Sequence, residues 1–217
     1  MGQWLKTWQA CLRDKRFLAA LAGALIFLAA GIASTYFAII YATESASNAV
    51  TDIILSNIHV YDIDGIFIYG PVIYWIVIGL YAVAEPKRLP FALKNIAVFS
   101  LIRSVFLTLT HIGPFPERAV TAFAPDSVIS VFTSGSDLFF SSHTGLPFLM
   151  ALVFWQNKRL RIFSIIASLF FGAVVLLSHV HYSIDVFAAF FITYAIFHIA
   201  EKLFAKDREL FRQGLRH

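Results

Sequence analysis

The sequence predicts an all-α integral membrane protein in which six transmembrane helices form one bundle and both termini lie in the cytoplasm. Three observations support this prediction. Of the 217 residues, 59% are hydrophobic and 16% aromatic, and the mean hydropathy of +0.76 is far above that of ordinary soluble domains. Six apolar stretches are long enough to be spans, and the basic residues are distributed unevenly between the segments that connect them.

The six apolar stretches set the number of predicted spans. A bilayer core about 30 Å thick requires about 20 mostly apolar residues per helix. The stretches are residues 17–41, 66–84, 89–110, 138–155, 160–178 and 183–204. The first follows basic residues and contains small residues, as a secretory signal does. Its apolar part is longer than that of a typical signal, so we expect a retained span.

Lysine and arginine placement predicts the orientation, because cytoplasmic loops carry a positive excess. Nearly all of the 17 basic residues lie in segment 1–16, after the second and fourth stretches, and in the C-terminal tail. Only Arg118 lies in the alternate segments, while Lys94 and Arg103 lie inside the third stretch. We therefore expect cytoplasmic termini. The net charge of +4 then serves as a topological anchor and requires no nucleic-acid partner.

No repeat or linker divides the chain, and we expect a single membrane domain over 1–217. It comprises an interfacial basic helix at 1–16, a six-helix core at 17–204 and a basic tail at 205–217. Trp4, Trp8, Cys11 and Leu12 recur at helical spacing, which suits a helix lying in the membrane interface. Cys11 is the single cysteine, so no intramolecular disulfide can form.

The outer segment 43–65 contains four acidic residues and no basic ones. Its apolar residues are spaced for a short surface helix. We interpret the acids as solvated loop charges rather than metal ligands, because they lack tight ligand spacing. They are Glu44, Asp52, Asp62 and Asp64.

Histidines open two of the apolar stretches, in "LFFSSHTGLP" (138–147) and "SHVHYSIDVF" (178–187). In the predicted orientation both stretches begin on the outer side, so His143, His181 and Asp185 lie at similar depth. His181 and Asp185 are four residues apart and share a helical face. A carboxylate beside an imidazole fixes its tautomer and stabilises its substituted form, as required if His181 attacks phosphorus. His143 would protonate the departing oxygen and later activate a hydroxyl or water.

Polar residues around these histidines predict a seat for phosphate. Backbone N–H groups and hydroxyls at a helix start bind anionic oxygens, and this start carries Ser141, Ser142 and Thr144. Arg103, two turns before Thr110, would clamp the phosphate. Two roles remain open for each of two residues. Ser141 fits equally well as a helix cap, and Arg103 also fits as a snorkelling residue or the partner of an acid.

Three further residues near the motifs have supporting or undecided roles. Asp137 shares a helical face with Ser141 and either reads a head group or caps the helix. His179 and Tyr182 adjoin His181 and are expected to support the site or contact the head group. His59, His111 and His198 have no partner at an informative spacing, and we interpret them as structural.

Together the two motifs resemble the sphingomyelin synthase-like branch of the type-2 phosphatidic acid phosphatase (PAP2) superfamily. That branch carries Cys-Gly-Asp, three residues, then Ser-Gly-His-Thr, and this chain has "GSDLFFSSHT" at 135–144. A second mark is His-Tyr-Ser/Thr-x-Asp-Val, matched by "HYSIDV" at 181–186. An arginine seven residues before a threonine is matched by Arg103 and Thr110. The resemblance spans about residues 95–200 and includes the six-helix plan.

The resemblance implies a lipid phosphatase or phosphotransferase that acts without a cofactor or metal on the non-cytoplasmic leaflet. Its catalytic triad would be His143, His181 and Asp185, and its partner would be a lipid substrate from the bilayer. The chain departs from the family pattern where Cys-Gly becomes Gly135-Ser136 and where Gly becomes Ser142. "YDIDG" also stands where Pro-Leu-Pro-Asp is expected, and the Lys-x6-Arg-Pro and Ser-Arg motifs of the wider group are missing.

Two other functions remain open on the residues alone. In a metal-dependent hydrolase, His179, His181, Asp185 and His143 would ligate zinc or iron. In an inert membrane scaffold or a transporter, the polar mouth would be a binding cavity. The sequence leaves the lipid head group, the acceptor and the oligomeric state open.

Overall fold

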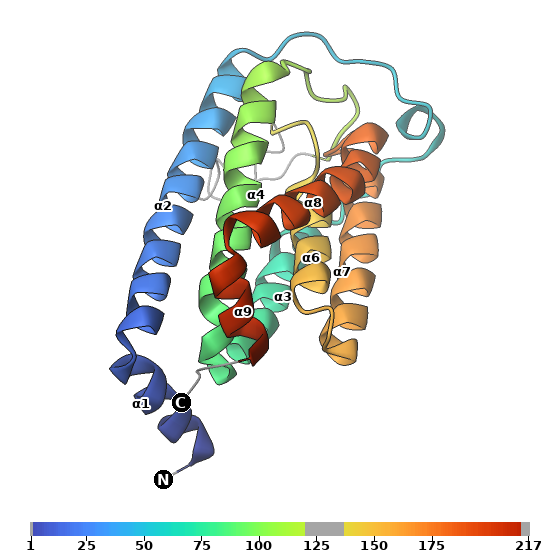
Figure 1. Cartoon of the computed structure of the whole chain (residues 1–217). Coiled ribbons are helices and arrows are strands. Elements are labelled where there is room, and N and C mark those ends of the chain that lie inside the picture. Colours follow the sequence, from blue (N-terminus) through green and yellow to red (C-terminus); the bar gives the residue numbers. More distant parts are fainter. Residues whose placement is uncertain (1, 120–136, 214–217) are drawn as a thin grey trace.

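A computed structural model describes residues 2–119 and 137–213, and these residues contain helices and loops but no strands. Five long helices and one shorter helix are arranged side by side (Figure 1). The long helices are α2 (Lys15–Glu44), α3 (Asp64–Ala84), α4 (Leu89–Leu109), α7 (Lys158–Leu177) and α8 (Ser183–Leu203), and the shorter one is α6 (Ser142–Val153). Smaller elements are α1 (Gln3–Arg13), α9 (Ala205–Gln213) and two 3-10 turns, η1 (Leu55–Asn57) and η2 (Pro86–Arg88).

Five helices of the described residues are long and apolar enough to cross a membrane. Their outward faces carry large apolar side chains that remain exposed, such as Ile26 at 71%, Leu80 at 69% and Phe191 at 78%. A soluble protein rarely exposes apolar surface of this extent, whereas lipid solvates it without cost. The fold is therefore that of an integral membrane protein.

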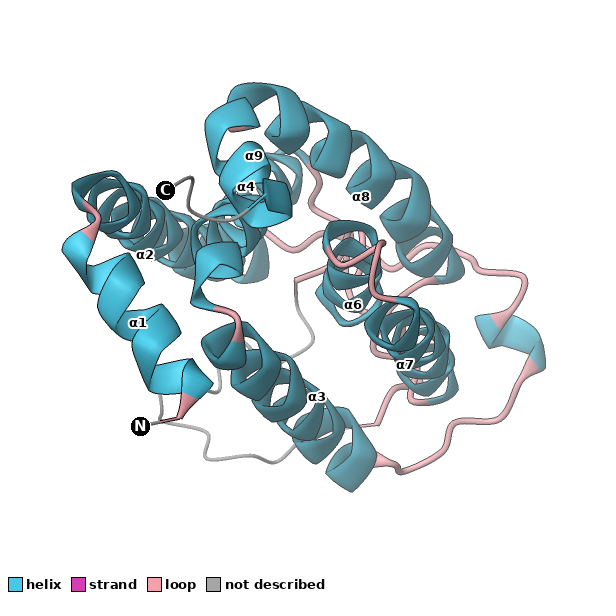
Figure 2. Ribbon diagram, turned by 60° about the horizontal axis from the view of Figure 1, so that its bottom comes forward, coloured by secondary structure: helices cyan, strands magenta, loops and turns pink. Residues whose placement is uncertain are grey.

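The fourth expected span, residues 138–155, is helical only over the 12 residues of α6. Such a helix is about 18 Å long and does not cross a bilayer core unaided. Residues 137–141 form a loop instead, in which Phe139 and Phe140 have positive φ angles of 107° and 26°. Figure 2 shows α6 inside the bundle, where α4, α7 and α8 pack around it. Because protein and not lipid surrounds it, α6 need not match the bilayer thickness.

Small residues let the helices approach closely. A Cβ on Gly31 of α2 would lie 3.2 Å from the Ala97 carbonyl oxygen of α4. A Cβ on Gly145 of α6 would lie 2.8 Å from the Phe99 ring and 2.9 Å from the Thr193 hydroxyl of α8. Such contacts are typical of membrane helix interfaces, where van der Waals packing replaces the hydrophobic effect. They hold α6 against α4 and α8, and so position the start of α6.

The helix α1 contacts the last turn of α3. The indole N–H groups of Trp4 and Trp8 donate to the Val83 carbonyl oxygen at 3.3 and 2.9 Å. Asp14 then caps α2 by accepting a hydrogen bond from the Arg16 N–H at 2.8 Å. In Figure 1, α1 and α9 lie at the same end of the bundle.

Two loops meet at the opposite end, where α2, α4 and α7 finish. Ser47 N–H donates to the His111 carbonyl oxygen at 2.8 Å, and Gly113 N–H donates to that of Asn48 at 3.1 Å. Instead of the expected short surface helix, segment 43–65 has the end of α2, extended chain, η1 and the start of α3. These loops contact the start of α8 through Val50, Asp52 and Gly113.

Candidate active site

His181 and Asp185 form a buried imidazole–carboxylate pair at the start of α8. His181 Nδ1 lies 3.2 Å from Asp185 Oδ2, and both side chains are at most 1% exposed. Asp185 Oδ2 also accepts a hydrogen bond from the Tyr182 N–H at 3.0 Å. His181 itself precedes the helix, so the turn into α8, and not a shared helical face, brings the pair together. A carboxylate in this position holds His181 Nδ1 as the proton donor and leaves Nε2 as the nucleophilic nitrogen.

His143 lies beside this pair, at the second position of α6. Its ring stacks on that of Phe67 of α3, with centroids 4.5 Å apart, and lies 6.4 Å from the His181 ring centroid. A backbone hydrogen bond from Ser141 N–H to the Asp185 carbonyl oxygen, 3.0 Å long, joins the two helix starts. The sequence-predicted juxtaposition of His143, His181 and Asp185 is therefore present in the fold.

Arg103 of α4 holds the loop that leads into α6. Its Nε donates to the Phe140 carbonyl oxygen at 3.0 Å, and its Nη2 donates to the Asp137 carbonyl oxygen at 2.8 Å and to Asp137 Oδ2 at 2.6 Å. Both side chains are buried. Arg103 therefore pairs with an acid, which is one of the roles that the sequence left open for it. Its Nη1 has no protein partner among the described residues.

The Arg103–Asp137 pair also explains two unusual backbone angles. Phe139 and Phe140 have positive φ angles, which are unfavourable for side chains of this size. Arg103 binds carbonyl groups on both sides of this turn and so offsets the strain. Asp137 neither caps α6 nor faces solvent.

The three hydroxyl residues at the start of α6 occupy different environments. Ser141 is the N-cap residue, yet its fully buried Oγ makes no capping hydrogen bond and has no partner within the described part of the chain. Ser142 begins the helix and is partly exposed. Thr144 is turned towards α7, where its Oγ1 would lie 3.3 Å from a Cβ on Gly172. Ser141 is thus the hydroxyl whose position best suits a ligand.

Tyr182 and His179 fasten the site to the outer loops. The Tyr182 hydroxyl donates to the Gly113 carbonyl oxygen at 2.8 Å and accepts from the Val50 N–H at 3.2 Å. His179, in a left-handed conformation with φ 54°, places Nδ1 2.8 Å from the Glu117 carbonyl oxygen. Both rings are buried, so these contacts support the position of His181 between them.

Asp52 is a structural residue that sequence reasoning missed. It was expected to be a solvated loop charge, but it is 7% exposed and its Oδ2 accepts from the Ser183 N–H at 2.7 Å, at the start of α8. Its Oδ1 accepts from the N–H groups of Ile54 and Leu55. Burial would raise the pKa of Asp52, but these hydrogen bonds outweigh burial and lower it. The partner is 131 residues away, so no local pattern in the sequence signals the contact.

Buried polar atoms without partners gather around the two histidines. Within the described chain, eight buried side-chain nitrogen or oxygen atoms lack a hydrogen bond, and five of them belong to these two helix starts. Buried polar groups are normally paired, and unpaired ones call for an explanation such as a missing ligand or a catalytic role. The five belong to Ser141, His143, Thr144, His179 and Asp185.

This arrangement can perform nucleophilic and general acid–base chemistry on one phosphoester. His181 has the orienting carboxylate that a nucleophile requires, and His143 is a second imidazole within reach of the same bound group. Among residues 2–119 and 137–213, no three His, Cys, Asp or Glu side chains are grouped as metal ligands. His179 Nδ1 is directed to a backbone carbonyl and not to His181 or Asp185.

Comparison with known proteins finds a similarity over the same region. Residues 135–202 match the family model for the PAP2 superfamily C-terminal region, which includes both histidine motifs and Asp185. The match supports a relation to the PAP2 superfamily, whose members are generally phosphatases. No curated protein and no solved structure matches the chain significantly.

Proposed function

We propose that this PAP2-like chain is an integral membrane enzyme that cleaves a phosphoester of a lipid through a phosphohistidine at His181. The phosphoryl or phosphorylated head group then passes to water or to a lipid alcohol, as in the sphingomyelin synthase-like branch. The observation that best supports this function is the concentration of unpaired buried polar atoms around His143 and the His181–Asp185 pair. Among them, the Ser141 hydroxyl and the His143 ring nitrogen are groups that a bound phosphoester would engage.

The first step breaks the bond between phosphorus and the leaving oxygen. The Nε2 lone pair of His181 forms a bond to phosphorus, and His143 donates a proton to the departing lipid oxygen. Asp185 accepts the hydrogen bond from His181 Nδ1–H and stabilises the positive charge that develops on the ring. The Ser141 hydroxyl and the free N–H groups of the first turn of α6 hold phosphate oxygens.

The second step regenerates the enzyme. His143, now neutral, removes the proton from water or from a lipid alcohol, and that oxygen attacks phosphorus while the bond to His181 breaks. His143 is then protonated again, so the cycle balances. Arg103 keeps the loop before α6 in place, and we assign its Nη1 to a phosphate oxygen. The remaining residues that we propose around the bound phosphoester are Ser142, Thr144, Tyr182 and His179.

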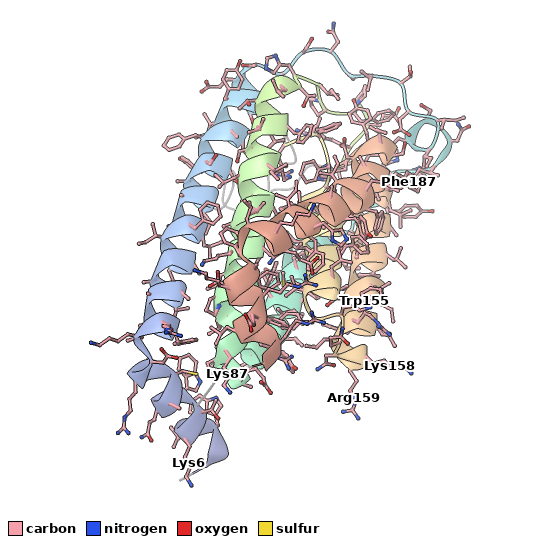
Figure 3. The ribbon with its side chains drawn as sticks, viewed as in Figure 1. Lys6, Lys87, Trp155, Lys158, Arg159 and Phe187 are labelled. Atoms are coloured by element: carbon pink, nitrogen blue, oxygen red, sulfur yellow. The ribbon has the colours of Figure 1, made fainter. Side chains whose placement is uncertain are left out.

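The proposed membrane arrangement has six crossings in one domain over 1–217. The fourth crossing consists of α6 and the loops on either side of it. The termini then lie in the cytoplasm and the histidines on the non-cytoplasmic side. The end of the bundle that carries α1 and α9 also carries Lys6, Lys87, Lys158 and Arg159 (Figure 3), in agreement with the positive-inside rule.

A comparison of lipid products tests the function. The purified proteins, which are wild type, His181→Ala and His59→Ala, would be incubated with phospholipids, ceramide and diacylglycerol, with and without EDTA. All products would be analysed by mass spectrometry. We expect a dephosphorylated or newly made phospholipid from wild type and from His59→Ala, whose ring is exposed on the outer loop. His181→Ala should make none. Turnover that survives in His181→Ala would reject the phosphohistidine, and loss of wild-type turnover in EDTA would favour the metal-dependent hydrolase.

A further inference from the structure

A basic groove lies at the end of the bundle opposite the histidines. Its volume is about 560 Å³, and its lining includes four cationic residues. None of the described residues that line it is acidic. The cations are Arg88, Lys158, Arg159 and Arg212, which come from η2, α7 and α9. Segments far apart in the sequence thus bring their charges to one hollow.

Contacts around Arg88 build one wall of the groove. Arg88 Nη1 donates to the Tyr81 hydroxyl at 2.7 Å, and the guanidinium carbon lies 5.3 Å from the Phe211 ring centroid. Asn157 Nδ2 donates to the same hydroxyl at 2.8 Å. Glu85 touches Arg88 Nε at 3.8 Å but is itself half exposed. Arg88 is therefore held in place before any ligand arrives, which lowers the entropy cost of binding.

The other wall is α9, which is fixed by its own contacts. Lys94 Nζ of α4 lies 2.8 Å from Asp207 Oδ2, and both side chains are largely buried. Phe211 packs edge to face on Phe91, with ring centroids 5.6 Å apart, and lies at the same distance from Phe154. The groove is a formed feature of the fold.

The cations at the start of α7 interact unfavourably with the dipole of that helix. Lys158, Arg159 and Arg161 occupy its first turns, and no acidic residue lies in the first turn. The positive end of the helix dipole favours acids at this position, so the three charges oppose the helix electrostatically. Figure 3 shows Lys158 and Arg159 at the tip of α7. An anion bound between α7 and α9 would relieve this repulsion.

An apolar chamber adjoins the groove. Its volume is about 310 Å³, and it shares Gln156, Phe211 and Arg212 with the groove. Its other lining residues include Phe91, Leu152 and Phe197. Glu201, Arg208 and His198 also line it, and Glu201 is already paired with the other two. A charged hollow that continues into an apolar one fits an amphiphile with an anionic head and a hydrocarbon chain.

We propose that this groove binds the phosphate of an anionic phospholipid, with part of an acyl chain in the adjoining chamber. The site is separate from the histidines, because Asp185 and Glu201 lie near opposite ends of α8, about 24 Å apart along the helix axis. It does not rest on the proposed reaction. The phosphate chemistry could equally come from inorganic phosphate, so the test includes both sources.

Native mass spectrometry of the detergent-purified full chain tests the proposal. The probes are phosphatidylglycerol, phosphatidylcholine with the same acyl chains, and inorganic phosphate. Wild type should retain phosphatidylglycerol in preference to phosphatidylcholine. Arg159→Gln should weaken phosphatidylglycerol binding about fivefold, the effect of one cation near a membrane surface. Because Arg159 opposes the dipole of α7, its removal should not unfold the protein, and thermal unfolding would verify this.

Two control variants distinguish binding in the groove from nonspecific electrostatic attraction of the anionic lipid and from binding at the His181 site. Lys6→Gln removes an exposed cation on α1, at the same end but outside the groove, and should change binding less than about twofold. His181→Ala should retain the lipid as wild type does. Equal weakening by Arg159→Gln and Lys6→Gln would overturn the proposal, as would equal retention of the two lipids. Retention of inorganic phosphate without phosphatidylglycerol would also overturn the assignment to a lipid.

Discussion

An imidazole–carboxylate pair lies near each end of helix α8, and the two pairs have similar distances but different surroundings. His181 Nδ1 lies 3.2 Å from Asp185 Oδ2, and His198 Nδ1 lies 3.0 Å from Glu201 Oε2. The first pair is buried, whereas the His198 side chain is 45% exposed and Glu201 also pairs with Arg208. A short distance between a histidine and an acid therefore does not identify a site.

The surroundings of the two pairs carry the functional information. Near His181, polar atoms of Ser141, His143 and Asp185 are buried and have no partner among the residues that the structure describes. Glu201 has two cationic or titratable partners, so its charge is already balanced. An ion pair that is partly exposed and already neutralised contributes little to stability or to chemistry. A buried pair whose polar atoms lack hydrogen bonds lowers the stability of the fold. We infer that the protein tolerates this loss of stability at the His181–Asp185 pair because the pair is catalytic.

The sharpest test of this contrast replaces the acid at each end of α8. Asp185→Asn should lower turnover by about 10²- to 10⁴-fold, because the amide no longer fixes the His181 tautomer or stabilises its charge. Glu201→Gln should change turnover less than about twofold. Both variants would be assayed on the lipid found in the product screen, with thermal unfolding as the folding control. Similar losses in the two variants would break the comparison.

A smaller effect is expected at Arg103, where stability and not chemistry is measured. Arg103→Met leaves Asp137 as a buried, unpaired charge, which should destabilise the protein by about 3–5 kcal/mol. Adding Asp137→Leu should recover part of this loss, because the uncompensated charge is gone. The double-mutant cycle would be measured by unfolding in detergent. Additive losses would show that the pair is not coupled, contrary to the 2.6 Å contact.

The smallest predicted effect is at Asp52, which lies in the outer loop and accepts a hydrogen bond from the Ser183 N–H at the start of α8. Its folded-state pKa is lowered, so its contribution is present above the ordinary carboxyl pKa and is lost as the pH falls through the lowered value. Asp52→Asn should cost about 1–2 kcal/mol at neutral pH. The unfolding temperature of Asp52→Asn should also fall less than that of wild type when the pH is lowered from about 6 to about 3. Parallel pH profiles for the two proteins would contradict the role of Asp52.

The sequence predicted the helices well because lipid-facing segments must be apolar along their whole length. Five of the expected spans have their helices within a few residues of the predicted ends. The fourth was predicted too long, since Leu138, Phe139 and Phe140 look like span residues. Arg103 holds that segment as a loop through contacts 34 and 37 residues away in sequence, which hydropathy does not register.

The juxtaposition of the histidine motifs was also predictable, because orientation and spacing suffice to place two helix starts at one depth. The partners of individual side chains were not. The contacts of Asp52 with Ser183 and of Tyr182 with Gly113 join distant loops. His198 was assigned no partner from spacing, yet Glu201 lies one turn away. Such contacts depend on how loops and helix ends fold, and local patterns do not encode them.

The most direct test of the central claim is to trap the phosphorylated enzyme. A phosphate ester with a good leaving group, such as 4-nitrophenyl phosphate labelled with ³²P, needs little protonation in the first step but still needs a base in the second. Rapid alkaline quenching of His143→Gln should therefore reveal label on the peptide that contains His181, and His181→Ala should carry none. Label on another residue, or turnover by wild type without any labelled histidine, would contradict the phosphohistidine.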